Sequence, residues 1–248
     1  MKVAVLGAKG KMGRECVAAI SAAKDLELVS QIDLGDDITT IKNAGAQVIV
    51  DFTNPDSVMK NLEFAITNGI NAVIGTTGFN DEKLEKVKKL LSANPKVGVL
   101  IAPNFGIGAI LMMQFAKQAA AHFDSAEIME FHHASKADAP SGTAARTAEL
   151  ISNVRKTKQK PAMPDSTKTA LPGARGAKIG DVAIHSIRSD GYVAHQEVVF
   201  GSSGETLTIR HDSIDRAGYM PGVSLGIREV AKHPGLTIGL ENFMPEFK

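Results

Sequence analysis

The first hundred residues alternate short apolar runs with longer amphipathic segments, and this alternation leaves few folds open. Residues 3–6 are apolar at every position, as in a strand that is covered on both faces. We expect further strands at residues 26–32, 48–52, 72–74 and 97–101, and helices at residues 12–22, 55–67 and 81–91. Strands separated by helices pair in parallel through right-handed crossovers. The sequence therefore predicts an α/β fold with a doubly wound parallel sheet.

After residue 103 the pattern changes, which predicts a second region with a mainly antiparallel sheet. Residues 182–188, 192–200 and 206–211 have the character of strands and are joined by turns suited to hairpins. Residues 155–174 are polar and interrupted by prolines, so we expect a mobile loop there. The other expected elements are a helix over 108–121, a strand over 126–131, a helix from Ser141 to about 154, a helix over 215–232 and a strand over 235–240.

Composition and charge narrow the classes of function. The formal net charge is +1, which argues against a nucleic-acid-binding protein held by bulk electrostatics. No apolar run reaches the ~18 residues that span a bilayer. The single cysteine, Cys16, excludes an intramolecular disulfide and a multi-thiolate metal site. We therefore expect a cytoplasmic protein with no nucleic-acid or membrane partner.

A glycine-rich turn joins the first predicted strand to the first predicted helix. Its glycines follow a G-x-x-G-x-x-G spacing from Gly7 to Gly13. Glycines let the chain turn sharply and let a pyrophosphate approach unpaired N–H groups at the helix start. A tight turn without a ligand is the alternative. The candidate dinucleotide-binding residues in this turn are Gly7, Ala8, Lys9, Gly10, Lys11 and Met12.

Three later segments extend the candidate dinucleotide site. Asp33 ends the second predicted strand about 20 residues after the turn, where a carboxylate can bind the adenosine ribose. Asp33 favours NADH, whereas Lys9 and Lys11 could neutralise the 2′-phosphate of NADPH, so we expect both cofactors to be used. Two segments end strands at the sheet edge where ligands bind, although they could be ordinary loops. They contain Gly75, Thr76, Thr77, Ala102, Pro103, Asn104 and Phe105.

Residues 130–144, EFHHASKADAPSGTA, carry the densest polar chemistry of the chain. Consecutive residues of a strand point to opposite faces, so His132 and His133 cannot easily share one metal ion. No H-E-x-x-H spacing supports zinc either, and we predict no metal. Hydride delivery to a conjugated imine leaves electron density that a histidine can protonate near neutral pH. This chemistry favours a reductase.

The same segment holds groups that suit an anionic substrate. Lys136 supplies a fixed cation. Ser141, Gly142 and Thr143 open a helix, so their backbone N–H groups offer a site for a carboxylate. The alternative is a capped helix after a strand with two surface histidines.

Four segments, residues 7–13, 75–78, 102–105 and 130–144, closely resemble the 4-hydroxy-tetrahydrodipicolinate reductase (dihydrodipicolinate reductase) family of the diaminopimelate route to lysine. The resemblance covers nearly the full length, and its H-H-x-x-K-x-D-A-P-S-G-T run is highly specific. It implies a Rossmann-type cofactor domain over residues 1–105, completed by 216–248. It also implies an inserted substrate-binding and oligomerisation domain over 106–215, whose mixed sheet assembles a homotetramer. The implied reaction is reduction of 4-hydroxy-tetrahydrodipicolinate, or its dehydrated form, to tetrahydrodipicolinate by NADH or NADPH.

Residue roles carry over from the family by position. The resemblance implies that His132 is the proton donor and Lys136 its catalytic partner, and that His133, Gly142 and Thr143 contact the substrate. The dinucleotide site coincides with the candidates given above. Leu34 follows Asp33 where some relatives have an arginine suited to a 2′-phosphate, which argues against a strong preference for NADPH.

Two other classes of protein remain as alternatives. The first is another nicotinamide-dependent enzyme of amino-acid metabolism, although the chain has no glycine-framed nucleophilic cysteine of the kind a semialdehyde dehydrogenase needs. The second is a non-catalytic dinucleotide sensor. A sensor would not require His132 and Lys136 together beside an anion-binding turn.

Overall fold

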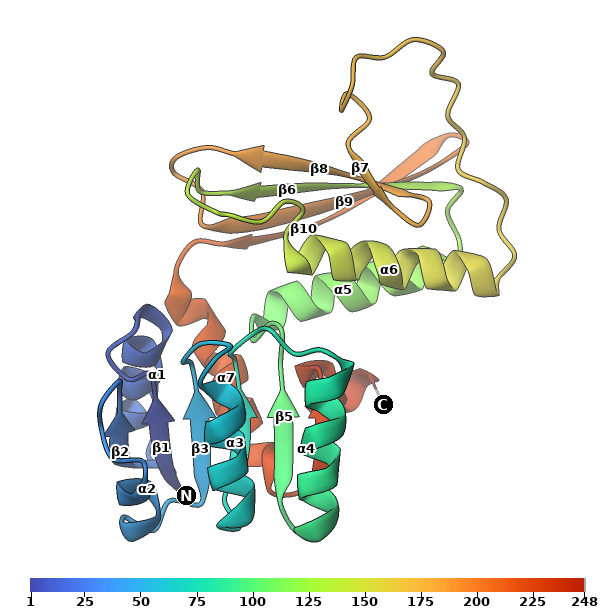
Figure 1. Cartoon of the computed structure of the whole chain (residues 1–248). Helices are drawn as coiled ribbons and strands as arrows, with labels where there is room; N and C mark the ends of the chain where they lie inside the picture. The colour runs from blue at the N-terminus through green and yellow to red at the C-terminus, as the bar shows by residue number, and fades with distance from the viewer. Residues whose placement is uncertain (248) are drawn as a thin grey trace. The chain divides into compact units, whose positions relative to one another are not determined.

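The computed structural model describes residues 1–247, which fold into two compact units (Figure 1). The first unit comprises Met1–Ile107 together with the residues from Arg216 onward, and the second comprises Gly108–Asp215. None of the helices among the described residues combines the length and the apolar character that a membrane crossing requires.

The first unit is built on a six-stranded parallel sheet with the order β11-β5-β4-β3-β1-β2. The strands are β1 (Lys2–Leu6), β2 (Glu27–Ile32), β3 (Val48–Asp51), β4 (Asn71–Ile74), β5 (Gly98–Ile101) and β11 (Gly235–Ile238). Leu236 of β11 pairs with Val99 of β5 in parallel, so the C-terminal segment completes the N-terminal sheet. The chain order reverses between β1 and β3, which is where open α/β sheets bind ligands.

Helices cover both faces of this sheet (Figure 1). They are α1 (Lys11–Ala22), α2 (Thr39–Asn43), α3 (Val58–Thr67), α4 (Asp81–Ala93) and α7 (Met220–Val230). Leu62 of α3 and Val87 of α4 share one buried cluster with alternate strand residues such as Ile49. On the other face, α7 packs on β4 and β5. All residues of β3 and β5 are buried, which explains why their sequences are apolar except for Asp51 at the end of β3.

Some predicted boundaries in the first unit were wrong. The third helix begins at Val58, not at Pro55, because Asn54 forms a separate turn in which its Oδ1 accepts the N–H groups of Asp56 and Ser57 at 3.0 Å each. The last helix also begins late, after a 3-10 turn over Arg216–Tyr219. The five-residue helix α2 was not predicted, because it is too short to show a periodic pattern.

The second unit holds a mixed five-stranded sheet with the order β10-β9-β6-β8-β7. Its elements are α5 (Ile107–Ala119), β6 (Ser125–His132), α6 (Gly142–Thr157), β7 (Ala177–Ile179), β8 (Val182–Arg188), β9 (Ala194–Ser202) and β10 (Glu205–Ser213). The central strand β6 pairs with β8 in parallel and with β9 in antiparallel orientation. Both helices lie on one face of the sheet (Figure 1).

The predicted loop over residues 155–174 begins too early. Arg155 belongs to the last turn of α6 and is only 3% exposed. Its guanidinium donates to Asp181 and to the carbonyl oxygens of Phe123 and Pro161, so the start of the following segment is anchored. The short strand β7 closes this segment and was not predicted.

Candidate active site

The glycine-rich turn packs closely against the residue that follows β3 and against itself. Gly7 has φ +75°, a conformation that favours glycine, and an added Cβ would lie 2.6 Å from the carbonyl oxygen of Phe52. A Cβ on Gly13 would lie 2.0 Å from the carbonyl oxygen of Gly7. Both glycines are therefore required by the turn itself, apart from any ligand.

The helix that follows this turn begins without a side-chain cap. Its N-cap is Gly10, and its first turn contains no acidic residue. Lys9 and Lys11 are exposed beside it, whereas Ala8 is buried and Met12 half-buried. Uncapped N–H groups and the positive end of the helix dipole attract anions. The chemistry of this turn fits a pyrophosphate.

Asp33 follows β2 and contacts the turn directly. Its Oδ2 accepts the backbone N–H of Lys9 at 2.7 Å, and its Oδ1 accepts that of Leu34 at 2.9 Å. The backbone N–H groups of Leu34 and Lys9 lower the pKa of the Asp33 carboxyl, so it is ionised near neutral pH. The neighbouring Leu34 side chain is 96% exposed. Asp33, the residue predicted to bind the adenosine ribose, therefore lies beside the turn predicted to bind the pyrophosphate.

A buried carboxylate, which the sequence analysis did not single out, organises the ends of β3 and β4. Asp51 is fully buried. Its Oδ1 accepts the hydroxyls of Thr53 and Thr76 at 2.7 Å each, and its Oδ2 accepts Nδ2 of Asn61 at 2.8 Å. Thr76 is itself only 7% exposed, so it belongs to the scaffold of this edge. An acidic residue at the end of an otherwise apolar strand was the available sequence signal.

The other predicted dinucleotide residues lie at the same sheet edge. The N–H of Gly75 donates to the carbonyl of Asp51, and that of Ala102 to the carbonyl of Ile74, so the ends of β3, β4 and β5 are adjacent. A Cβ on Gly75 would lie 2.2 Å from the ring of Phe52, so this glycine makes room for an aromatic side chain. Of the remaining candidates, Thr77 and Pro103 are exposed, Asn104 is half-buried, and Ala102 and Phe105 are buried.

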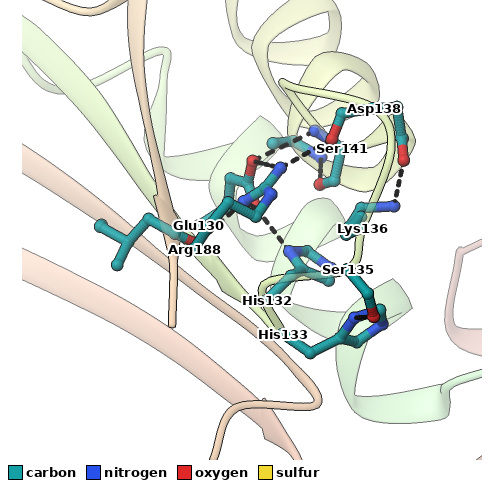
Figure 2. A network of polar contacts seen from close by, with 10 residues as sticks. Glu130, His132, His133, Ser135, Lys136, Asp138, Ser141 and Arg188 are labelled. Atoms are coloured by element: carbon teal, nitrogen blue, oxygen red, sulfur yellow. Dashed lines mark hydrogen bonds and ion pairs between the residues drawn. The ribbon is translucent and has the colours of Figure 1, made fainter. Parts of the chain in front are cut away.

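In the second unit, a buried carboxylate lies beside the predicted proton donor (Figure 2). The side chain of Glu130 is 0% exposed, and its Oε2 lies 2.5 Å from Nδ1 of His132. Arg188 donates to both carboxylate oxygens, from Nη1 to Oε2 at 2.9 Å and from Nη2 to Oε1 at 2.8 Å. Burial raises the pKa of the Glu130 carboxyl, but hydrogen bonds from His132 and Arg188 more than offset this and lower it to about 2.

The two adjacent histidines have different partners. Whereas His132 contacts Glu130, Nδ1 of His133 lies 2.8 Å from the hydroxyl of Ser135 (Figure 2). Residues 1–247 contain no group of three or more His, Cys, Asp or Glu side chains arranged to hold a metal ion.

Lys136 is paired with a carboxylate rather than with His132. Its Nζ donates to Oδ1 of Asp138 at 2.6 Å (Figure 2). The hydrogen bond from Lys136 lowers the pKa of the Asp138 carboxyl. The carbonyl of Asp138 accepts Nη2 of Arg188 at 2.8 Å, so the lysine segment is tied to the same guanidinium as Glu130.

Ser141 caps α6, as predicted. Its hydroxyl accepts the N–H of Ala144 at 3.2 Å, and its own N–H donates to Oε1 of Glu130 at 3.3 Å. Gly142 is exposed, and an added Cβ there would meet no atom within 4 Å. No acidic residue occupies the first turn of α6, so Gly142 and Thr143 lie at an N-terminus that attracts anions.

The first unit is a doubly wound parallel fold with a glycine-rich turn at its switch point. The second unit carries a histidine and a lysine beside the start of a helix. Together these features define a class of protein. That class is the oxidoreductases with a Rossmann-type NAD(P)-binding fold.

Comparison with known proteins identifies the family within this class. The description "Dihydrodipicolinate reductase, N-terminus" matches residues 1–105, and "Dihydrodipicolinate reductase, C-terminus" matches residues 108–244. The chain is 58% identical to the 4-hydroxy-tetrahydrodipicolinate reductase of Mycolicibacterium gilvum, over 98% of this chain and 99% of the relative. It is 57% identical to that of Nocardia farcinica, over 98% of each protein. A solved dihydrodipicolinate reductase from Paenisporosarcina sp. TG-14, bound to dipicolinate, has a TM-score of 0.86 and 38% identity over 98% of each chain.

The chain belongs to the 4-hydroxy-tetrahydrodipicolinate reductase family, the oxidoreductases of lysine and diaminopimelate biosynthesis. The resemblance recognised in the sequence is thereby confirmed. The roles of individual site residues stay predictions.

Proposed function

We propose that this chain reduces 4-hydroxy-tetrahydrodipicolinate, or its dehydrated form, to tetrahydrodipicolinate, with NADH or NADPH as the hydride source and His132 as the proton donor. The observation that carries the proposal is the 2.5 Å contact between Nδ1 of His132 and Oε2 of Glu130. A buried carboxylate on one ring nitrogen leaves Nε2 as the nitrogen available to a substrate. The bound dipicolinate of the Paenisporosarcina relative supports a cyclic dicarboxylate as the ligand.

The residues of the first unit fit a dinucleotide because α1 starts without a side-chain cap, with the exposed Lys9 and Lys11 and the carboxylate of Asp33 beside it. When bound, the dinucleotide supplies a hydride. The turn from Gly7 to Met12 would hold its pyrophosphate and Asp33 its adenosine ribose. The nicotinamide half would lie at the ends of β4 and β5, against Gly75, Thr76, Thr77, Ala102, Pro103, Asn104 and Phe105.

The residues of the second unit would bind the dicarboxylate and protonate it. Lys136 can attract one substrate carboxylate, since its ammonium has three donors and Asp138 takes one of them. His133 and the N–H groups of Gly142 and Thr143 would bind the remaining oxygens. Once a hydride has added to the conjugated imine, the Nε2–H bond of His132 breaks and its proton joins the electron-rich atom of the substrate.

A coupled assay tests the reaction. Freshly condensed pyruvate and aspartate semialdehyde serve as substrate, and the loss of nicotinamide absorbance is followed. His132→Gln should lower kcat by about 10²–10⁴-fold with cofactor binding intact. A kcat within a few-fold of the parent would contradict the proton-donor role. Lys136→Ala should damage both KM and kcat, whereas a change in KM alone would make Lys136 a binding residue only.

Use of both cofactors is a separate proposal. It is supported by the exposed Lys9 and Lys11 beside the Asp33 carboxylate. Comparing kcat/KM for NADH and NADPH in phosphate-free buffer should give values within about two orders of magnitude, roughly 3 kcal/mol. A thousandfold preference for either would contradict the proposal.

We also propose that the chain forms a homotetramer through the sheet of the second unit. In β6, buried and half-buried residues alternate, so Met129 and Phe131 face away from the side on which Ile128 is buried. This partly exposed apolar face supports packing against a second copy. Light scattering after size-exclusion chromatography should give the mass of four chains, and Met129→Lys should give a smaller assembly. A monomeric parent protein would contradict the proposal.

A further inference from the structure

The carboxylate behind the proposed proton donor points to a further residue of the proposed reaction. Glu130 lies on β6 two residues before His132, and it contacts both Nδ1 of His132 and the guanidinium of Arg188 (Figure 2). We propose that Glu130, held by Arg188, is a positioning residue that fixes the tautomer of His132 and so makes Nε2 the atom that gives up the proton. This inference rests on the proposed function of His132.

The hydrogen-bonding capacity of Glu130, Arg188 and His132 determines which ring nitrogen of His132 carries a hydrogen. An ionised carboxylate accepts hydrogen bonds and donates none. Two donors from Arg188, one on each oxygen, keep the Glu130 carboxyl in its ionised form. Nδ1 of His132 must therefore carry a hydrogen at 2.5 Å from Oε2. A charged His132 then carries its second hydrogen on Nε2, and giving that proton away leaves the neutral ring with its hydrogen on Nδ1.

Arg188 also ties this pair to the groups proposed to bind the substrate. Its Nη2 donates to the carbonyl of Asp138, whose carboxylate holds Lys136. Oε1 of Glu130 accepts the N–H of Ser141, the cap of the helix start proposed as a carboxylate site. One buried carboxylate thus sets the orientation of the proton donor and fixes the ends of the segment that carries Lys136.

A purely structural ion pair would connect β6 to β8 without affecting the histidine, and the chain contains a matched example. Glu127, on the same strand, contacts both Arg175 and Nε2 of His185, the latter at 2.8 Å. Glu127 and Glu130 are three positions apart on β6, so the two side chains lie on opposite faces of the strand. Glu127→Gln therefore breaks a similar Arg–Glu–His group outside the proposed site.

Glu130→Gln separates the two interpretations. Oε1 of Glu130 takes donors from both Arg188 and Ser141, so the amide oxygen of the variant should occupy that place and its NH₂ should face His132. Nδ1 must then accept, and the neutral ring must carry its hydrogen on Nε2. Nitrogen-15 NMR of histidine-labelled protein reports this directly, with the His132 signals assigned from their loss in H132Q.

We expect the parent and E127Q to show the neutral ring of His132 protonated at Nδ1, and E130Q to show it protonated at Nε2. In the coupled assay, kcat of E130Q should fall by about 10²-fold or more, as when a catalytic histidine is held in the wrong tautomer. Its KM and its Kd for NADH should stay within about threefold, roughly 0.6 kcal/mol. E127Q should retain kcat within the same margin.

An unchanged His132 spectrum in E130Q, or an equal loss of kcat in E127Q, would overturn the inference about Glu130. A changed tautomer with unchanged kcat would instead overturn the proton-donor role of His132. If E130Q shows no cooperative unfolding, Glu130→Asp replaces it, because this variant keeps the charge opposite Arg188 but withdraws the carboxylate from His132 by one methylene. We then expect a mixture of tautomers and a partial loss of kcat, and parent values of both would overturn the inference.

Discussion

Replacing Arg155 with methionine should destabilise the second unit more than any substitution of an exposed arginine on the same helix. The Arg155 side chain is 3% exposed. Its Nε donates to Oδ2 of Asp181 at 2.8 Å, and its Nη1 and Nη2 donate to the carbonyls of Phe123 and Pro161 at 3.1 and 2.9 Å. Methionine fills much of the same volume but donates no hydrogen bond, so three acceptors lose their partner.

The expected loss follows from these contacts. Breaking a buried ion pair costs about 3–5 kcal/mol because the remaining charge stays buried. The Asp181 side chain is 35% exposed, so water can solvate it in the variant, and the lower end of that range applies. We expect the free energy of unfolding to fall by about 3 kcal/mol, which corresponds to a fall in Tm of about 6–12 °C for a chain of this size.

Urea unfolding followed by far-UV circular dichroism provides the measurement, since the chain has no tryptophan. Arg146→Met is the matched control, because Arg146 lies on the same helix and its 3.3 Å pair with Glu149 is exposed. That variant should lose less than about 0.5 kcal/mol. A loss below about 1 kcal/mol in R155M, or equal losses in the two variants, would refute the reasoning.

The pH dependence gives a second check on the same variant. Burial raises the pKa of Asp181, but hydrogen bonds from Arg155 and Ser152 outweigh burial and lower it overall. A carboxyl with a lowered pKa stabilises the fold above its ordinary pKa of about 3.9 and loses that contribution as the pH falls through the lowered value. The difference between parent and R155M should therefore shrink below about pH 4. A constant difference from pH 7 to pH 3 would contradict the assignment of the stabilisation to this ion pair.

Three further predictions concern the proposed site. Gly13→Ala should weaken NADH binding by about tenfold in calorimetry, because the alanine Cβ would lie 2.0 Å from a main-chain oxygen of the glycine-rich turn. Gly218→Ala is the control and should leave binding unchanged, because a Cβ there meets no atom within 4 Å. Asp51→Asn replaces one buried acceptor oxygen by an NH₂ group that faces the donors of Asn61 or Thr76. The free energy of unfolding, measured by urea denaturation, should therefore fall by about 1–3 kcal/mol. Asp138→Asn removes an anion that pairs with Lys136, so KM for the dicarboxylate should fall by about two- to fivefold at low salt. An unchanged KM would show that this pair does not compete with the substrate.

The parallel sheet of the first unit could be predicted because strands covered on both faces are almost continuously apolar, and β3 and β5 are buried at every position. Boundaries were harder, because a local polar side chain can end one turn and begin another. Asn54 accepts two N–H groups in a turn of its own, so the helix predicted from residue 55 starts only at Val58. Burial of Arg155 could not be predicted at all, since its carboxylate partner lies 26 residues further along the chain.

The candidate site shows the same division between local and distant information. Glu130 and His132 are two residues apart on one strand, so alternation alone places them on the same face, and their contact was open to prediction. Arg188 lies 58 residues from Glu130, and its role depends on the register in which His132 pairs with Arg188 between β6 and β8. No pattern in the sequence specifies that register, so the group that keeps Glu130 ionised emerges only from the fold.

Each unit has a buried carboxylate near the end of a strand, in contact with its proposed binding segment. Asp51 joins the ends of β3 and β4 to α3, and Glu130 joins the end of β6 to β8 and to the start of α6. A carboxylate can accept several hydrogen bonds at once, so it can fix several loops that no helix or strand ladder reaches. Leaving these donors unpaired in a buried site is costly, which makes each arrangement rigid. The exposed Thr77 and Gly142 and the half-buried Lys136 can therefore remain open to ligands while the buried carboxylates hold the adjoining backbone in place.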